Sequence, residues 1–364
     1  MSILVSMLAR AGEETPPPPP VQSEPPGQTV PPQPGQEISA NQSENPETKL
    51  PELLQLFFPP ENLDGRGLLH LQDVFPLAIL HLQIPTNTLE ILPKGGWKIR
   101  TGVNWSNTFA FEDQEADFIV DAETFQVEFG GWYALAPDFY LGAGFSIISR
   151  GAGILDPVVE GFHDAFGFSD GGRGDFPTNS YAISVTDGGS THLLESGTGA
   201  GDVILKSHWI LNRGNSWFPA AAVQLFAGLP TSTAGFGSNG LDLGASLSLY
   251  KTVLKIVHLY GIIGGTYLTD PEVEHLRFER VNYTATGGVE VAIFKSFSMV
   301  FQASYYSPLL RSPAVLDQSR NYLAAGFKWE VVKRVQVELS LLENLAPFNN
   351  SADLGIFLGF DFRF

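Results

Sequence analysis

The sequence contains no cysteine and little charge, and both shortages exclude classes of protein. Because none of its 364 residues is Cys, disulfide frameworks, thiolate metal sites and cysteine nucleophiles are excluded. Lys, Arg, Asp and Glu make up only 16% of the chain, against about 25% in soluble domains. The 21 Lys and Arg face 39 Asp and Glu, a net charge of -18, which argues against nucleic acid as a partner.

Long apolar runs are also missing. No segment reaches the roughly 18 consecutive apolar residues that a membrane-spanning helix needs, so a helical membrane protein is excluded. Glycine and phenylalanine, by contrast, are abundant, with 38 and 27 residues. Low charge combined with many Gly and Phe is typical of a sheet that faces lipid.

The N-terminal part divides into three segments. Residues 1–11 end in Ala9-Arg10-Ala11 and are similar to the remnant of a secretory signal peptide, although the basic region is missing; a frayed apolar end is the alternative. Residues 12–60 hold 14 of the 26 prolines, which predicts a disordered, acidic, Pro-rich linker that lies in the periplasm. Residues 61–96 form a transition segment. Its apolar stretch, 69–85, is either a plug inside a barrel lumen, as in barrels that resemble the long-chain fatty-acid transporters, or a short helix on the rim.

From residue 97 onwards, apolar and polar residues alternate with period two. In 97–111 one face carries Trp97, Ile99 and Val103, and the other carries Lys98, Arg100 and Asn104. This pattern, repeated over segments of about ten residues, predicts transmembrane β-strands with one face toward lipid and one toward a lumen. The predicted strands are 97–111, 124–135, 139–150, 200–212, 217–228, 240–251, 256–268, 282–295, 297–306, 320–331, 334–345 and 354–364.

These strands predict an all-β fold, a transmembrane antiparallel up-and-down β-barrel of 12 strands. A hairpin signal at 180–187 and 190–197, joined by Asp187-Gly188-Gly189-Ser190, raises the count to 14 if both segments enter the wall. The spacers alternate between short turns, such as 295–296, and long loops, such as 269–281, as in barrels with short periplasmic turns. Aromatic residues near the strand ends predict an interfacial girdle: Trp105, Tyr133, Trp209, Trp217, Tyr250, Tyr267, Tyr283, Tyr306 and Trp329.

The C-terminus argues against a soluble β-sandwich, which would also alternate. Residues 354–364 place an apolar residue at every second position and finish with Phe360, Phe362 and Phe364. This ending resembles the C-terminal signal that Gram-negative outer-membrane barrels present to their assembly machinery, and 97–364 as a whole resembles such a barrel. The stretch 153–166, with Gly171-Gly172-Arg173 and 196–202 after it, resembles an outer-membrane family of unassigned function. That resemblance implies no activity.

Charged and polar side chains on the inward face are the candidate binding residues, because a charge on the lipid face would be costly. They line a pore or bind a polar solute, or else form a structural ladder of ion pairs. This set comprises Lys98, Arg100, Glu128, Arg150, Lys206, His208, Asp242, Glu290, Lys328, Glu330, Glu338 and Arg363. His258 and Asp361 share the same face.

The loop 151–179 has a helical apolar period, with Asp156 as a cap and Pro157 in the first turn. We predict a loop helix that constricts the lumen or lies across its mouth as a lid. The candidate residues there are Asp156, Glu160, His163, Asp164 and Arg173. Neither a metal site nor catalysis is expected, because no zinc-ligand spacing or nucleophile elbow occurs.

The sequence therefore predicts a porin-like outer-membrane channel for passive passage of small solutes. A plugged barrel that handles a hydrophobic ligand, and a structural or assembly protein, are the alternatives. We expect no enzyme activity and no cofactor. The expected partners are outer-membrane lipid, the barrel assembly machinery and a small solute or hydrophobic ligand; the oligomeric state stays open.

Overall fold

The computed structural model describes residues 65–86, 91–112, 118–167, 172–187, 189–311, 316–345 and 350–364. All of them belong to one unit of the chain. The predicted signal segment 1–11, the predicted linker 12–60 and residues 61–64 lie outside the described residues.

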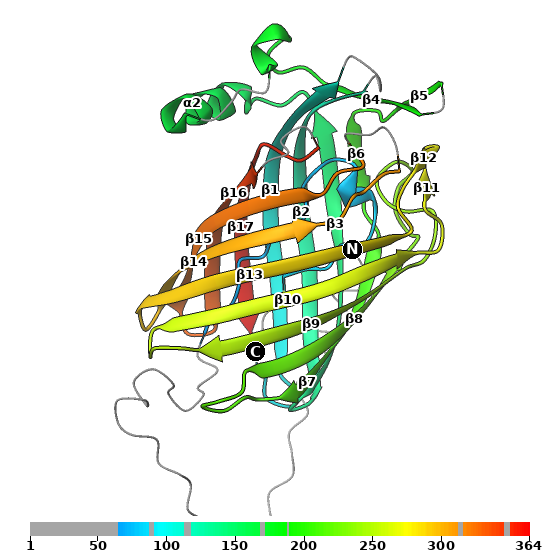
Figure 1. Ribbon diagram of the computed structural model, residues 1–364. Helices are drawn as coiled ribbons and strands as arrows, with labels where there is room; N and C mark the ends of the chain where they lie inside the picture. Colours follow the sequence, from blue (N-terminus) through cyan, green and yellow to red (C-terminus); the bar gives the residue numbers. More distant parts are fainter. Residues whose placement is uncertain are drawn as a thin grey trace, which may run out of the picture. The chain divides into compact units, whose positions relative to one another are not determined.

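Twelve antiparallel strands form a closed barrel, which confirms the predicted fold (Figure 1). The first strand closes the sheet, because β1 pairs with β2 on one side and with β17 on the other. The wall consists of β1 (Trp97–Glu112), β2 (Phe118–Ala136), β3 (Phe139–Gly151), β7 (Val203–Asn212), β8 (Ala220–Leu229), β9 (Asp242–Thr252), β10 (Val257–Leu268), β13 (Val281–Phe294), β14 (Phe297–Tyr306), β15 (Arg320–Val332), β16 (Val335–Leu345) and β17 (Leu354–Arg363). The other elements are the helix α2 (Asp156–Phe166), the 3-10 turns η1 (Ala78–Leu80) and η2 (Arg173–Asp175), and the short strands β4 (Ala182–Asp187), β5 (Ser190–Leu193), β6 (Gly197–Ala200), β11 (Glu272–Val273) and β12 (Leu276–Arg277).

The hairpin predicted near residue 188 forms but stays outside the wall. β4 pairs with β5 and, on its other side, only with the first four residues of β2. β6 likewise pairs only with the last residues of β3. The count of 12 strands is therefore correct, and the alternative of 14 is not, because these short strands extend the sheet beyond the closed part.

Alternation along the strands separates an apolar outer face from a buried inner face. On β10, for example, the outward Ile263 is 60% exposed whereas its neighbour Ile262, which faces the lumen, is 3% exposed. The predicted aromatic girdle is wrong for two residues. Tyr250 and Tyr306 occupy inward positions and are buried inside the barrel.

The two ends of the barrel differ. One end carries short connections, such as those between β2 and β3, between β13 and β14, and between β15 and β16; we call it the short-turn end. The other end carries the long connections, including 151–203 with α2, and is called the long-loop end (Figure 1). This alternation is the one that the sequence predicted.

No helix within the described residues has the length and the apolar character needed to cross a membrane.

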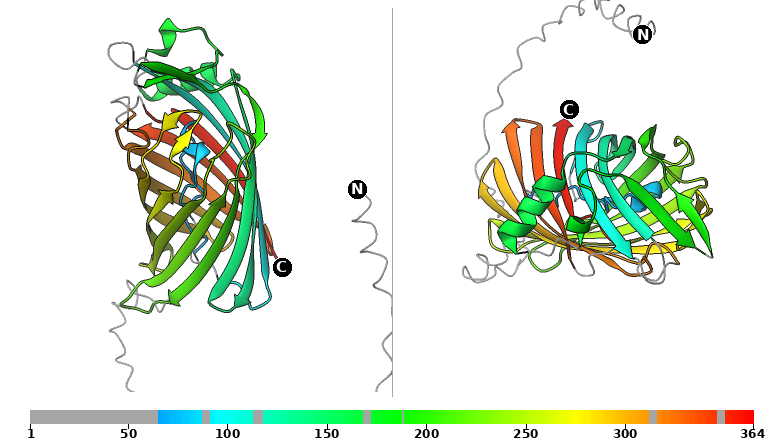
Figure 2. Two further views of the ribbon diagram at one scale, coloured as in Figure 1. Left: turned by 90° about the vertical axis from the view of Figure 1, so that its right-hand side faces the viewer. Right: turned by 90° about the horizontal axis from the view of Figure 1, so that it is seen from above.

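Residues 65–86 run inside the barrel, and we call them the luminal segment (Figure 2). Arg66 lies near the turn between β13 and β14, and the following Leu92 lies near Tyr140 of β3, so the chain enters and leaves at the short-turn end. Between these points Phe75, Leu77 and Leu80 pack with residues of the long-loop end such as Leu310. The luminal segment is thus a re-entrant loop.

Glycines on the inner wall make room for the luminal segment. A Cβ atom on Gly288 would lie 2.3 Å from Leu68, and one on Gly264 would lie 3.1 Å from Ile84. Gly244 faces Leu82 and Ile84 in the same way. The wall sequence is therefore matched to an occupied lumen.

Candidate functional site: the lumen and its cavity

Carboxylates of the inner wall bind the backbone of the luminal segment. The Glu290 carboxylate accepts hydrogen bonds from the Arg66 and Gly67 N–H groups, at 3.0 and 2.9 Å, and from the Tyr260 hydroxyl at 2.6 Å. The Asp242 carboxylate accepts from the Leu82 N–H at 3.0 Å. Both wall residues were predicted to face the lumen, and both hydrogen-bond to the luminal segment there.

A network of charges joins β1, β15, β16 and β17 inside the barrel. Asp361 receives the Arg100 guanidinium through two nitrogens and lies 3.2 Å from the Lys98 ammonium. Glu338 lies 3.3 Å from the Lys328 ammonium and accepts from the His70 N–H. Lys328 in turn donates to the Leu68 carbonyl. This network corresponds to the predicted ladder of ion pairs, with the luminal segment added to it.

Two histidines of the luminal segment each contact a wall carboxylate. His70 Nε2 lies 2.7 Å from Glu128 Oε2 on β2, and His81 Nδ1 lies 3.2 Å from Asp242 Oδ2 on β9. All four side chains are buried. These contacts fix the luminal segment to two separate strands of the wall, β2 and β9.

A buried triad that the sequence did not predict fixes the middle of the segment. Asp73 accepts a hydrogen bond from Arg320 Nε at 2.5 Å and another from the Tyr322 hydroxyl at 2.7 Å. Arg320 is an inward position at the first residue of β15, so parity alone would have placed it in the lumen. Its partner Asp73 lies in a segment without period-two alternation, and no pattern indicated where that carboxylate would lie.

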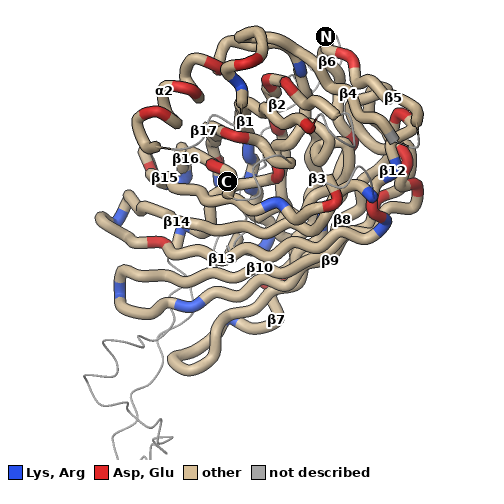
Figure 3. The backbone as a smooth tube through the Cα atoms, turned by 45° about the horizontal axis from the view of Figure 1, so that its top comes forward, with Lys and Arg blue, Asp and Glu red and all other residues tan. Residues whose placement is uncertain are grey.

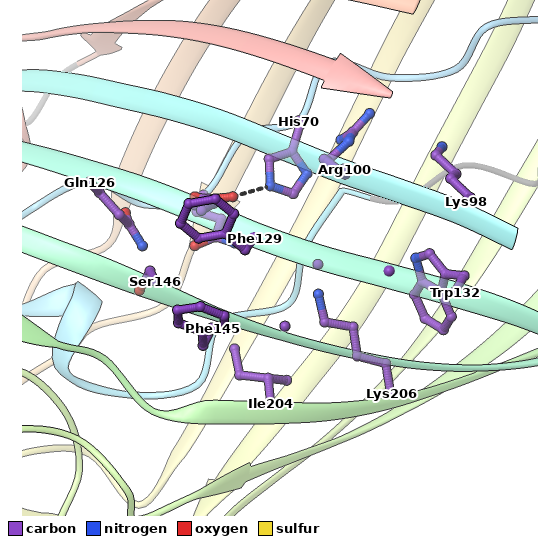
Figure 4. Close-up of a pocket in the computed structure, with 15 residues that line it drawn as sticks. His70, Lys98, Arg100, Gln126, Phe129, Trp132, Phe145, Ser146, Ile204 and Lys206 are labelled. Carbon is purple, nitrogen blue, oxygen red and sulfur yellow. Dashed lines mark hydrogen bonds and ion pairs between the residues drawn. The ribbon is translucent and has the colours of Figure 1, made fainter. Parts of the chain in front are cut away.

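A cavity remains between the luminal segment and the wall formed by β1, β2, β3 and β7 (Figure 4). Its volume is ≈ 70 Å³. The lining includes three basic side chains, Lys98, Arg100 and Lys206, together with Glu128 and His70. Trp132 and Ile204 supply the apolar part of the lining. Alternation in the sequence predicts one inner face for Lys98, Arg100, Glu128 and Lys206, and the structure brings all four to one cavity.

The remaining predicted lumen residues lie apart from this cavity. Arg150 donates to the Gly235 carbonyl at 2.6 Å and lies over the Phe236 ring, near the long-loop end. His208 contacts the rings of Trp132 and Tyr140. Glu330 accepts from the Arg334 N–H within a short turn, and Arg363 donates to Gln336. These contacts all lie within the wall and its loops, and they do not join the wall to the luminal segment.

Charge on the wall is unevenly distributed around the barrel. β8, β10 and β14 carry no Lys, Arg, Asp or Glu, and long uncharged stretches are visible in Figure 3. The basic residues that line the cavity come from β1 and β7. The lumen therefore has one strongly charged side.

The loop helix α2 forms as predicted, but it does not constrict the lumen. Its residues pack against Trp105 and Leu354, and His163 lies 3.3 Å from Glu343. These three wall residues alternate with inward neighbours and therefore point away from the lumen. Glu343 is a charged residue at an outward position, and His163 of α2 contacts it there. The loop therefore lies against the outer side of the wall and not across the mouth of the lumen.

Arg173 holds the same loop against the outer side of the wall. Its guanidinium donates to Asp156 at 2.5 Å, to Asp353 at 2.6 Å and to Asn107 at 2.7 Å. The Glu123 carboxylate accepts from the Ile154 and Leu155 N–H groups at 2.7 Å. We call this arrangement the α2 cap. Glu160 is half-buried and Asp164 is exposed, and these hydrogen bonds involve neither of them.

Two groups of the α2 cap titrate away from their ordinary ranges. Burial raises the pKa of Asp353 to about 6, although Arg173 opposes the shift. The hydrogen bond to Glu343 raises the pKa of His163 above its usual value. Within the described residues no group of three His, Asp or Glu side chains is placed to hold a metal ion.

The predicted C-terminal signal residues lie on the last strand and just beyond it. Phe360 and Phe362 occupy outward positions of β17 and are partly exposed, and Phe364 is 64% exposed. The final N–H of Phe364 donates to the Trp97 carbonyl at 2.9 Å, so the chain end is aligned with β1.

Comparison with known proteins identifies the family and supports the fold. The family model described as "Protein of unknown function (DUF3187)" matches residues 53–364, and the chain belongs to this family. No curated protein matches. Among solved structures, the COG4313 outer membrane channel from Pseudomonas putida F1 is similar at a TM-score of 0.52 and 14% identity, covering 75% of this chain and 97% of that one.

Two further structures match with lower scores. The KdgM porin in complex with disordered oligogalacturonate has a TM-score of 0.37 and 8% identity, and covers 74% of this chain and 99% of that one. The Pseudomonas putida toluene transporter TodX has a TM-score of 0.35 and 10% identity, and the match covers 75% of this chain and 89% of that one. These structural neighbours are an outer membrane channel, a porin and a transporter.

Proposed function

We propose that the chain is an outer-membrane channel for passive, gradient-driven passage of small solutes, and that the luminal segment narrows its pore. The observation that carries the proposal is a closed barrel with an apolar outside and a charged inside that keeps a polar cavity beside the luminal segment. Twelve strands enclose more space than side chains alone fill, since about eight strands suffice for a side-chain core. The short-turn end faces the periplasm, as is usual for such barrels.

Selectivity follows from the charges that border the open space. Lys206 lines the cavity from β7, whereas Glu290 is engaged with the luminal segment. We therefore expect Lys206, and not Glu290, to act directly on passing ions.

The test is single-channel conductance of the refolded full chain in a planar bilayer, after a heat-dependent gel shift has shown that the barrel is formed. We expect small discrete steps, and a reversal potential that shifts toward cation selectivity in Lys206→Met. Lys255→Met, in the turn between β9 and β10, is the matched control and should leave the reversal potential unchanged. A folded barrel that never conducts would contradict the proposal.

A plugged barrel for a hydrophobic ligand is the second candidate. It is favoured by the apolar side chains that the luminal segment already places in the lumen, among them Leu68, Leu82 and Ile84, which pack with Phe226 and Ile262 of the wall. A ligand that displaced the segment would find an apolar surface behind it. Lipid retained through purification would support this function, and a ligand-free protein that conducts would oppose it.

A further inference from the structure

The cavity beside His70 contains one cation, Lys206, whose nearest carboxylate partner, Glu128, is in direct contact with His70 instead. Lys98 and Arg100 are both engaged by Asp361, and Glu128 is engaged by His70. Among the described residues none is hydrogen-bonded to or ion-paired with the Lys206 ammonium, which lies 6.0 Å from the centre of the Trp132 ring. Figure 4 shows Lys206 extending into the space between Trp132 and His70.

The space in front of this ammonium is kept open by glycine. Gly130 and Gly144 are paired across β2 and β3 and both face inward. A Cβ atom on Gly144 would lie 3.1 Å from Lys206 Nζ, and one on Gly130 would lie 3.8 Å from it. Side chains at these positions would occupy the place where a group bound to Lys206 would sit.

The remaining lining suits an organic anion better than a mineral one. The Trp132 ring and the Ile204 side chain border the same cavity and offer apolar contact. Gln126 and Ser146 offer polar groups at the end of the cavity away from Trp132 (Figure 4). A carboxylate forms strong charge-assisted hydrogen bonds with an ammonium, and an aromatic side chain such as Trp132 packs well against a planar ring.

We propose that this cavity is a binding subsite for a small organic carboxylate, with Lys206 as the anion-binding group and Trp132 and Ile204 against the body of the solute. This inference rests on the proposed passage of solutes, because it names the class of solute for which the lumen has a site. Glu128 and Asp361 limit the site to one net positive charge, so a monocarboxylate fits better than a di- or tricarboxylate.

The experiment is equilibrium dialysis of the folded full chain in detergent at pH 8, with benzoate as the probe, benzamide as its neutral analogue and inorganic phosphate as a mineral anion. We expect saturable binding of benzoate that is about tenfold or more weaker in Lys206→Met. Lys255→Met should bind as the unmodified chain does. Gly130→Val keeps every charge but fills the cavity, and it should also weaken binding.

Each opposite result overturns the subsite. Unchanged benzoate affinity in both Lys206→Met and Gly130→Val, equal binding of benzamide, or binding of phosphate in preference to benzoate would each do so. If Lys206→Met does not show the heat-dependent gel shift, Gly130→Val alone decides. Because binding is measured without transport, a conducting channel that does not bind benzoate refutes only the subsite, and a silent barrel that binds it refutes only the channel.

Discussion

His70 and Glu128 contact each other inside the barrel at 2.7 Å, although 58 positions separate them in the sequence. His70 belongs to the luminal segment and Glu128 to β2, so this contact joins the segment to the wall at the border of the cavity. The same residue, His70, also donates its N–H to Glu338 on β16. A single residue of the segment thus bridges two strands that are separated in the wall by β1 and β17.

Glu128→Gln should loosen the luminal segment around His70. The substitution removes a buried charge that faces the imidazole, and hydrogen bonds to charged groups contribute about 1.5–3 kcal/mol. We expect faster hydrogen exchange of the amides in 68–72. Glu330→Gln is the control, since Glu330 also faces inward at the short-turn end, but its carboxylate accepts from the Arg334 N–H of its own turn and, within the described residues, makes no hydrogen bond to the luminal segment. Equal exchange in the two variants would mean that the His70 contact does not hold the segment.

Asp73→Asn should destabilise the barrel more than any exposed ion pair does. It leaves the buried Arg320 guanidinium without its counter-charge, and breaking a buried pair costs about 3–5 kcal/mol. The measurement is the temperature at which the folded band disappears in the gel-shift assay. Asp138→Asn breaks the exposed pair with Arg213, and such a pair contributes about 0–1 kcal/mol. Similar temperatures for both variants would refute the anchoring role of Asp73.

Gly288→Val should displace the luminal segment without altering any charge. Its Cβ atom would lie 2.3 Å from the Leu68 side chain, which is fully buried, and overpacking of this kind costs about 1–3 kcal/mol. We expect a larger single-channel conductance than in the unmodified chain. At Gly261, on the outer face of β10, a Cβ atom meets nothing within 4 Å. Gly261→Val should therefore conduct normally. An unaltered conductance in both variants would count against the close packing of the luminal segment on the glycines of the inner wall.

The α2 cap should open as the pH rises. Asp353 has a pKa of about 6 in the folded state against 3.8 ordinarily. Its contribution to the stability of the folded cap is therefore complete below pH 3.8 and is lost as the pH rises through about 6. The raised pKa of His163 acts in the same direction at higher pH, since its contribution is lost as the pH rises through the folded-state value. The Asp353 shift alone corresponds to about 3 kcal/mol.

Hydrogen exchange of peptides from 153–167, measured between pH 4 and pH 8 with the intrinsic rate removed, tests this expectation. Asp353→Asn should abolish the part of the change below pH 6, and His163→Gln the part above it. Protection of the cap that increases with pH would show that ion pairing with Arg173 outweighs the cost of burying the Asp353 carboxylate.

A lysine on the outer face should reveal which surface meets lipid. Ile263 is 60% exposed on β10, and a Lys at the midplane of a membrane costs about 2–4 kcal/mol. Leu193 is 66% exposed on β5, outside the closed wall. We expect Ile263→Lys to lower the yield of folded protein in lipid vesicles and Leu193→Lys to leave it unchanged. Equal yields would mean that this part of β10 does not face lipid.

Much of the wall follows from alternation in the sequence. Period two gives the face of each residue directly, which is why Lys98, Glu128 and Lys206 were assigned to one inner surface and why the strand bounds differ by only a few residues. β2 begins six residues earlier than predicted because its first part pairs with β4 as well as β1. The hairpin at 182–193 alternates like a wall strand, and only its pairing places it outside.

The contents of the lumen could not be derived in this way. The luminal segment has no period that relates Asp73 to Arg320 or His81 to Asp242, and these contacts depend on the path of an irregular chain. The position of the α2 cap, by contrast, left a signal. Asn107, Glu123 and Glu343 are polar residues at outward positions, where a lipid-facing strand would carry apolar ones.

The re-entrant path of the luminal segment determines how it responds to mechanical force. Since the chain enters near Ser298 and leaves near Tyr140, both at the short-turn end, no chain end has to be threaded through the barrel to extract it. A pull at Gly65 loads the contacts with Glu290 first, then those with Lys328, then the Asp73 anchor, and last the contacts of His81 and Leu82 with Asp242. The segment therefore peels away one contact after another, under a smaller force than simultaneous rupture of all its contacts would require.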